Sequence, residues 1–184
     1  MQIYGFLVAS SSGIPIFTRI AEKTPFKGGL RGGKELITIT GFLSAMNQFL
    51  EKLTSTQERH ENLCLNAQVQ DFAFTTKTWE IKSENRPTAE KIIFILLHSA
   101  EDFEASKALL SVLENKFLLM YPGPKILDLI ESGEIIRSEE SIGTEFCRIY
   151  DQIIHNFRVS LSERHLEIEF NLSDTENGNN FRCD

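Results

Sequence analysis

Two short apolar runs at the start of the chain predict a pair of strands. The first covers residues 3–9, the second covers residues 14–21, and the sequence Ser-Ser-Ser-Gly lies between them at residues 10–13. Serine and glycine favour tight turns, so this pattern is typical of an antiparallel hairpin. Because Pro15 cannot donate to a sheet ladder, we expect it at the start of its strand or at an edge of the sheet.

Three further stretches predict the rest of the sheet. Apolar and polar positions alternate over residues 63–74, with a change of phase near residues 70–71 that indicates a bulge or turn. Residues 78–81 add a short strand. Residues 92–97 are apolar without a break, which is typical of a central strand covered on both faces. The count favours a five-stranded sheet.

Apolar residues recur at a helical spacing in three segments. The first is residues 38–54. The second follows Ser99, a candidate N-cap, and ends before the Tyr-Pro-Gly-Pro sequence at residues 121–124. A short helical turn over residues 126–130 precedes the third helix, residues 146–157. The apolar stripes carry six phenylalanines that we expect in the core: Phe42, Phe49, Phe103, Phe117, Phe146 and Phe157.

The order of these elements predicts an α+β fold, a mostly antiparallel five-stranded sheet flanked by helices in the order β-β-α-β-β-β-α-α. At 184 residues the chain fits one ordinary domain, which we place at residues 1–158. Residues 159–184 then form a C-terminal extension with a polar end that frays. Within it, Leu166, Ile168 and Phe170 alternate with polar residues, which indicates a short strand or a segment that a partner orders.

Charge and cysteine content limit the partners and the compartment. The formal net charge is −7, and nucleic acids and anionic lipids bind basic surfaces, so we expect no nucleic-acid partner and only indirect membrane association. No segment approaches a membrane span, which needs about 18 apolar residues. No basic stretch precedes the apolar start as it does in a secretory signal. Three widely separated cysteines fit neither a disulfide framework nor a zinc site, which favours the cytoplasm.

A glycine-rich segment, residues 28–34, matches the GxxxxGK pattern of phosphate-binding loops. However, Glu35 stands where a Ser or Thr hydroxyl would reach magnesium, and a carboxylate there repels phosphate. Our main interpretation is a flexible glycine loop. Its cations Lys27, Arg31 and Lys34 are candidate contacts for an acidic partner. The alternative is a nucleotide-binding enzyme that uses this loop.

No pattern indicates a catalytic, cofactor-binding or metal-binding residue. The four histidines have no metal-ligand spacing. His98 ends the central apolar run, where we expect a partly buried, hydrogen-bonded ring rather than a catalytic base. Cys147 is expected to pack against the core, and the serines of residues 10–12 lack the GxSxG frame of a hydrolase. We therefore expect no enzyme and no cofactor.

The element order and the opening of the chain resemble the longin domain family. Residues 7–12, Leu-Val-Ala-Ser-Ser-Ser, turn through Gly13 into residues 14–17, Ile-Pro-Ile-Phe, as in the first longin domain of the tandem-longin exchange-factor proteins. Residues 92–121, an apolar strand followed by an acidic helix start, are similar to longin-like proteins of archaea related to eukaryotes. The resemblance covers residues 2–158. Longin domains share no catalytic motif, so no site residue transfers.

The resemblance implies a non-catalytic protein–protein interaction module, a scaffold or subunit in vesicle trafficking or small-GTPase regulation. The partners it implies are a small GTPase, another longin or roadblock domain, or a second copy in a homodimer. A roadblock-type dimer scaffold is a further alternative, which a helix ahead of the first strand would favour. The sequence offers two sets of candidate contacts: Lys27, Arg31 and Lys34 in the glycine loop, and Leu166, Ile168 and Phe170 near the C-terminus.

Overall fold

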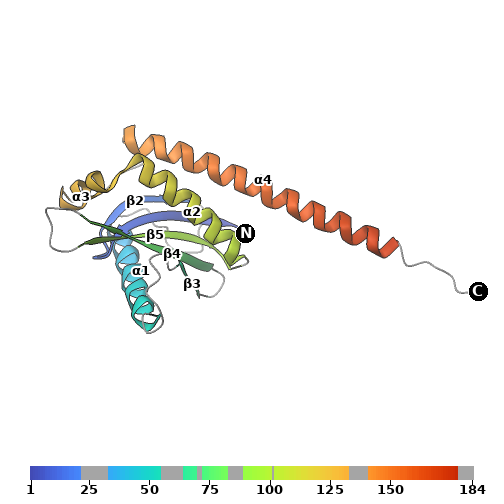
Figure 1. Ribbon diagram of the computed structural model, residues 1–184, viewed down its shortest axis with the longest axis horizontal. Helices are drawn as coiled ribbons and strands as arrows, with labels where there is room; N and C mark the ends of the chain where they lie inside the picture. The colour runs from blue at the N-terminus through green and yellow to red at the C-terminus, as the bar shows by residue number, and fades with distance from the viewer. Residues whose placement is uncertain are drawn as a thin grey trace, which may run out of the picture. The chain divides into compact units, whose positions relative to one another are not determined.

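The computed structural model describes nine elements (Figure 1). It covers residues 1–21, 33–54, 64–69, 72–82, 89–100, 102–132 and 141–177. The strands are β1 (Ile3–Ser10), β2 (Pro15–Ile20), β3 (Cys64–Val69), β4 (Phe72–Ile81) and β5 (Glu90–Ser99). The helices are α1 (Gly33–Thr54), α2 (Phe103–Met120), α3 (Gly123–Ser132) and α4 (Ser141–Asn177). The predicted α+β fold is confirmed.

The described residues fall into two compact units, Met1–Cys147 and Arg148–Asp184. The first unit holds the whole sheet, α1 to α3 and the first residues of α4. The second consists of the rest of α4 and the residues after it. The predicted division at residue 158 stays a prediction.

The five strands form one sheet in the order β2-β1-β5-β4-β3, and every neighbouring pair is antiparallel. Strand β5 lies at the centre, and its residues 92–99 are all buried, as the unbroken apolar run predicts. Strand β2 begins at Pro15 and forms an edge, which confirms both expectations for this proline. Residues 72–81 form one ten-residue strand rather than a strand end and a separate short strand.

The predicted hairpin between β1 and β2 is confirmed, and its turn lies against α1. Gly13 has a φ of 86°, in the left-handed region that only glycine adopts readily. A Cβ atom at Gly13 would also lie 2.7 Å from the Cα atom of Gly41 in α1. The hairpin turn and the helix therefore meet backbone to backbone.

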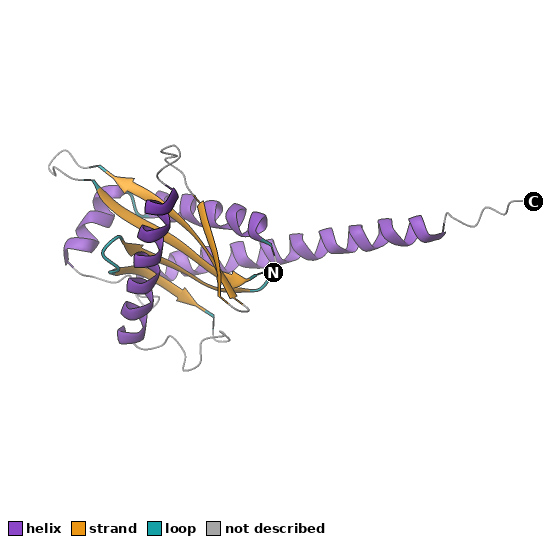
Figure 2. Cartoon of the chain, turned by 90° about the horizontal axis from the view of Figure 1, so that it is seen from below, coloured by secondary structure: helices purple, strands orange, loops and turns teal. Residues whose placement is uncertain are grey.

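Helices cover both faces of the sheet, α1 on one and α2 on the other (Figures 1 and 2). On the α2 face the core is aromatic. The ring of Phe117 lies 5.9 Å from Phe17, 5.8 Å from Phe94 and 5.2 Å from Phe146, measured between ring centroids. The ring of Tyr121 also belongs to this group, and its centroid lies 4.6 Å from that of Phe117. Tilted and edge-to-face pairs at these distances are the favoured aromatic geometry.

The N-cap of α2 is Asp102, not Ser99 as the sequence suggested. The Asp102 carboxylate accepts a hydrogen bond of 2.9 Å from the Ala105 N–H, while Ser99 is the last residue of β5. The Ser99 hydroxyl instead accepts the N–H of Gln2 at 2.8 Å. The strand continues to Ser99 because this residue pairs with Phe72 of β4.

The expected strand around Leu166, Ile168 and Phe170 is wrong, because α4 continues without interruption from Ser141 to Asn177. Between Thr144 and Asn177 the sequence contains no glycine and no proline, so nothing in this segment ends a helix that has already begun. At the other end of the chain, α1 begins at Gly33, five residues before the predicted start at residue 38.

Candidate functional site

Helix α1 is attached to the hairpin turn by polar side chains. Thr40 donates to the carbonyl of Gly13 at 2.8 Å, and Ser44 donates to the carbonyl of Ser10 at 3.2 Å. One turn further along, Gln48 donates to the carbonyl of Ser11 at 2.6 Å. These donors recur every four residues, so they form one stripe along the helix.

A second polar contact holds α1 to strand β4. The Asn47 side chain accepts the Thr76 hydroxyl at 2.7 Å and donates to the Thr78 hydroxyl at 3.0 Å. Leu43 is the fully buried apolar residue among the described side chains of α1, and Met46 is half-buried beside it. Among the described side chains, the inward side of this helix therefore combines Leu43 and Met46 with the hydrogen-bonding residues Thr40, Ser44 and Asn47.

The outward side of α1 carries two exposed phenylalanine rings. Phe42 is 57% exposed and Phe49 is 62% exposed, so the expectation that both lie in the core is wrong. Seven residues make nearly two turns of helix, which places both rings on one line with exposed Ala45 between them. We call Phe42, Ala45 and Phe49 the outer stripe of α1.

Other large apolar side chains are exposed in isolation. On α2, Val112 and Leu119 are exposed, but the inward side of that helix is apolar and fully buried at residues such as Leu113 and Phe117. Scattered apolar residues of this kind are normal on protein surfaces. What distinguishes α1 is that two exposed rings, Phe42 and Phe49, share one line along the helix.

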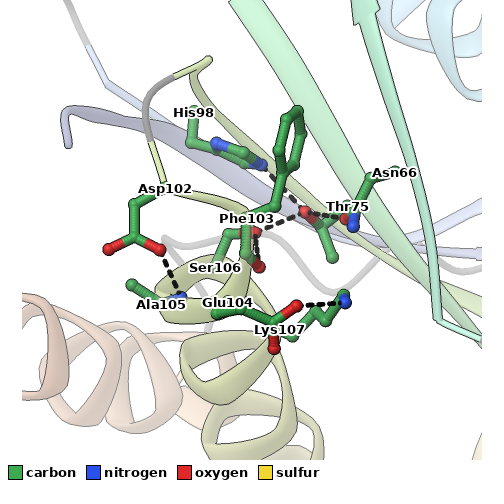
Figure 3. Close-up of polar contacts among 9 residues, drawn as sticks. All are labelled: Asn66, Thr75, His98, Asp102, Phe103, Glu104, Ala105, Ser106 and Lys107. Carbon is green, nitrogen blue, oxygen red and sulfur yellow. Dashed lines mark hydrogen bonds and ion pairs between the residues drawn. The ribbon is translucent and has the colours of Figure 1, made fainter.

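A buried polar cluster on the α2 face joins β3, β4, β5 and α2 (Figure 3). The Thr75 hydroxyl at its centre lies 2.7 Å from the Asn66 side-chain oxygen and 2.8 Å from His98 Nε2. It also lies 2.7 Å from the Ser106 hydroxyl, which donates to the carbonyl of Phe103. A hydroxyl beside an imidazole is the geometry of a nucleophile and its base. Here Thr75, His98 and Ser106 are all fully buried, so no substrate reaches them.

The hydrogen bonds of His98 define the charge state of this cluster. Its Nδ1 lies 2.8 Å from the carbonyl of Ser99, which can only accept, so Nδ1 carries a hydrogen. In the neutral ring Nε2 is then an acceptor. The single Thr75 hydroxyl hydrogen therefore faces three acceptors, Asn66 Oδ1, His98 Nε2 and, when the Ser106 hydroxyl donates to the carbonyl of Phe103, Ser106 Oγ. Burial lowers the pKa of His98, against the bond to Ser99 and the charge of Asp102. The expectation of a buried, hydrogen-bonded histidine is confirmed.

An ion pair between Lys77 and Glu114 ties β4 to α2 beside this cluster, and both side chains are largely buried. Cys64 pairs with Lys77 across the strands. Burial raises the pKa of the Cys64 thiol, although Lys107 and Lys77 lower it. Reactive cysteines have a lowered pKa, so the surroundings of Cys64 do not activate it. Cys147 is buried, as expected.

The residues that the sequence singled out as contacts lie mostly beyond what the structure describes. Lys27 and Arg31 fall outside the described residues. Lys34 lies in the first turn of α1, and its side chain is not described. Leu166, Ile168 and Phe170 lie in α4, and their side chains are not described either. Sequence reasoning missed the outer stripe of α1, which an unusual surplus of Thr, Ser and Asn between its apolar positions could have indicated.

The surroundings of the glycine loop agree only in part with a phosphate-binding loop. The pattern ends at the start of α1, which supplies a helix N-terminus as such loops do. The strand before it, β2, is an antiparallel edge strand, whereas a phosphate-binding loop follows a strand of a parallel sheet.

In the part of the chain that is described, no three His, Cys, Asp or Glu side chains gather as metal ligands would. None of the described helices has the length and apolar character needed to cross a membrane. The chain matches no model of a known protein family and no curated protein sequence.

Proposed function

We propose that this protein is a non-catalytic interaction module of the longin type, a cytoplasmic scaffold or subunit in vesicle trafficking or small-GTPase regulation. The observation that carries the proposal is the outer stripe of α1. The element order β-β-α-β-β-β followed by helices agrees with the longin plan. Fold likeness alone does not establish a function, so the argument rests on the stripe.

The two phenylalanine rings of the stripe leave apolar surface exposed to solvent. Burying the exposed part of a phenylalanine side chain stabilises a complex by about 1–2 kcal/mol. Burial of both rings would therefore favour association with another chain. The hydrogen bonds of Thr40, Ser44 and Asn47 prevent α1 from rolling over to bury these rings itself, because rolling would leave buried polar groups without partners. A rigid helix that holds two rings outward is a surface prepared for another chain.

Affinity capture with the purified protein as bait tests this proposal. The wild-type chain, the double variant F42S/F49S and a matched control V112S/L119S are compared at equal concentration, in lysates loaded with GDP or with a non-hydrolysable GTP analogue. The control removes two exposed apolar side chains from α2 instead of α1. We expect the wild type and the control to associate with the same proteins, or with themselves, and the stripe variant to lose that association. Equal behaviour of all three baits contradicts the proposal.

Nucleotide binding by residues 28–34 is the second candidate, favoured by the position of the loop directly before a helix N-terminus. It predicts that millimolar ATP or GTP raises the thermal unfolding temperature of the wild type and that Lys34→Ala abolishes this rise. No rise with either nucleotide removes this candidate.

A further inference from the structure

We propose that the buried polar cluster around Thr75 is a proton-operated switch between the edge strand β3 and the central strand β5. Neutral His98 takes the hydrogen of the Thr75 hydroxyl, and protonated His98 releases that hydrogen to Asn66. The switch lies inside the α2 face of the sheet (Figure 3). It does not depend on the outer stripe of α1 or on any partner.

The Thr75 hydroxyl makes three short contacts, each with a different element. Its oxygen lies 2.7 Å from Asn66 Oδ1 on β3, 2.8 Å from His98 Nε2 on β5 and 2.7 Å from the Ser106 hydroxyl on α2. Figure 3 shows these side chains converging on the Thr75 hydroxyl. All three distances are those of hydrogen bonds, so each contact needs one hydrogen.

The neutral cluster has one hydrogen too few. Ser106 can supply the hydrogen of its own contact, because its hydroxyl can donate either to Thr75 or to the carbonyl of Phe103. Asn66 Oδ1 and the Nε2 of a neutral His98 are both acceptors. Among the described residues, Thr75 is the donor that contacts them. One hydroxyl hydrogen cannot serve both, so one of these two contacts is left without a hydrogen.

Protonation of His98 supplies the missing hydrogen. The neutral ring has a single N–H, and the Ser99 carbonyl 2.8 Å from Nδ1 requires it there. Moving it to Nε2 would leave the contact with Ser99 without a hydrogen. The charged ring carries a hydrogen on both nitrogens. Its Nε2 then donates to Thr75, whose own hydrogen goes to Asn66, and every contact is satisfied at the observed distances.

Burial decides which acceptor receives the hydrogen while His98 is neutral. His98 is fully buried, so its Nε2 has no water to replace a lost donor, and an unsatisfied buried acceptor is costly. Asn66 is only half-buried and lies on the edge strand, where water can donate to its oxygen. The hydrogen therefore goes to His98 in the neutral cluster. Acid redirects it to Asn66 and strengthens the connection between β4 and β3.

Charged groups on the neighbouring elements act on His98 in opposite directions. The amino group of Met1, ahead of β1, lowers the pKa of His98, and the carboxylate of Asp102, ahead of α2, raises it. Burial has the largest effect and lowers this pKa, so the switch operates on the acid side of neutral pH.

The other ionisable groups on this side of the sheet do not change charge in that range. Burial raises the pKa of the Cys64 thiol on β3, which therefore stays neutral. Charged side chains of β4 and α2 are joined in two ion pairs, Lys77 with Glu114 and Lys107 with Glu104. His98 is thus the group whose protonation controls the hydrogen of Thr75.

NMR spectroscopy of the full chain from about pH 8 to about pH 5 tests the switch directly. The ring nitrogens of His98 report its charge and tautomer, and the side-chain carbonyl carbon of Asn66 reports whether its oxygen accepts a hydrogen bond. We expect the neutral ring to carry its hydrogen on Nδ1 and the Asn66 signal to move with the same midpoint as His98. Asn47, which accepts the Thr76 hydroxyl on the other face of the sheet, is the internal reference and should not move.

Two variants separate the transfer of the hydrogen from the electric field of the new charge. Thr75→Val keeps the shape of the side chain and removes the hydroxyl, so His98 should still titrate while the Asn66 signal stays fixed. Thr75→Ser keeps a hydroxyl and should restore the linked movement. An Asn66 signal that does not follow His98 in the wild type overturns the proposal. A signal that follows it equally in Thr75→Val also overturns it, because the field alone would explain that result.

Asn66→Leu provides a second measure at a half-buried position. It removes the acceptor that completes the charged cluster, so the titration midpoint of His98 should fall by about 0.5 on the pH scale, the value of one hydrogen bond. Gln68→Leu is the control, because it adds the same apolar side chain at an exposed position on the same side of β3. A midpoint in Asn66→Leu equal to that of the wild type or above it overturns the proposal, and so do equal falls in both variants.

Discussion

The two faces of the sheet are covered by helices in opposite ways. On the α2 face, phenylalanine rings from β1, β2, β5, α2 and the start of α4 pack into a closed aromatic group, and the polar cluster around Thr75 sits beside it. On the α1 face, hydrogen bonds from Thr40, Ser44 and Asn47 attach the helix, and two rings remain outside. The same sheet thus carries one helix that completes the aromatic core and one helix that leaves two phenylalanine rings exposed.

The largest expected effect comes from the aromatic group. Phe117→Ala should lower the free energy of unfolding by about 3–5 kcal/mol, because it opens a cavity among rings that cannot collapse onto one another. Chemical denaturation measures the change. The control is Leu119→Ala on the same helix, where an exposed side chain should cost no more than about 0.5 kcal/mol. Similar losses for both variants would mean that Phe117 is not a core residue.

The next effect concerns the attachment of α1. Asn47→Ala leaves the buried Thr76 hydroxyl without the acceptor it has at 2.7 Å, and we expect a loss of about 1–3 kcal/mol. Gln48→Ala, one residue further on, removes an exposed hydrogen bond and should cost less than about 1 kcal/mol. If the two losses are equal, hydrogen bonds do not fix the rotation of α1.

His98 gives the α2 face a dependence on pH. Burial lowers its pKa in the folded protein below the unfolded value of 6.5, so the unfolded chain takes up the proton first as the pH falls. Stability from this group is complete above pH 6.5 and falls below it, by at most about 1.4 kcal/mol per pH unit. His98→Gln should flatten the profile between pH 6.5 and 5, and His155→Gln, at an exposed position of α4, should not. A profile unchanged in His98→Gln contradicts the assignment.

The smallest effect on stability is expected from the outer stripe. F42S/F49S should change the free energy of unfolding of the dilute monomer by no more than about 0.5 kcal/mol, because neither ring packs into the core. Denaturation at a low protein concentration measures this. A loss of several kcal/mol would place these rings in the interior and remove the basis for an interaction surface.

The sequence predicted the features that depend on neighbouring residues. The Ser-Ser-Ser-Gly turn indicated the hairpin, and the unbroken run at 92–97 indicated the central strand, because turn chemistry and apolar continuity are local properties. The C-terminal ends of α1 and α2 were predicted as well, although α1 begins earlier than its periodicity indicated. The alternation at Leu166, Ile168 and Phe170 predicted a strand that does not form. These residues lie in a long helix, α4, and no glycine or proline ends that helix before them.

The sequence could not predict which side of α1 faces the sheet. The carbonyls that Thr40 and Ser44 reach belong to a turn about thirty residues away, and no local pattern records them. The cluster around Thr75 depends in the same way on His98 and Ser106 of later elements. Periodicity identified a helix with many apolar residues. Its long-range contacts, the hydrogen bonds of Thr40 and Ser44 and the packing of Leu43, place Phe42 and Phe49 outside.

The contact between Gly13 and Gly41 links the hairpin turn to the direction in which the outer stripe of α1 points. Any side chain at Gly13 would have to displace the α1 backbone, since there is no flexible group between them to give way. Such a displacement would tilt the helix and redirect both rings without altering either. A substitution in the hairpin turn would therefore alter the direction of two exposed rings that lie on the other side of the helix.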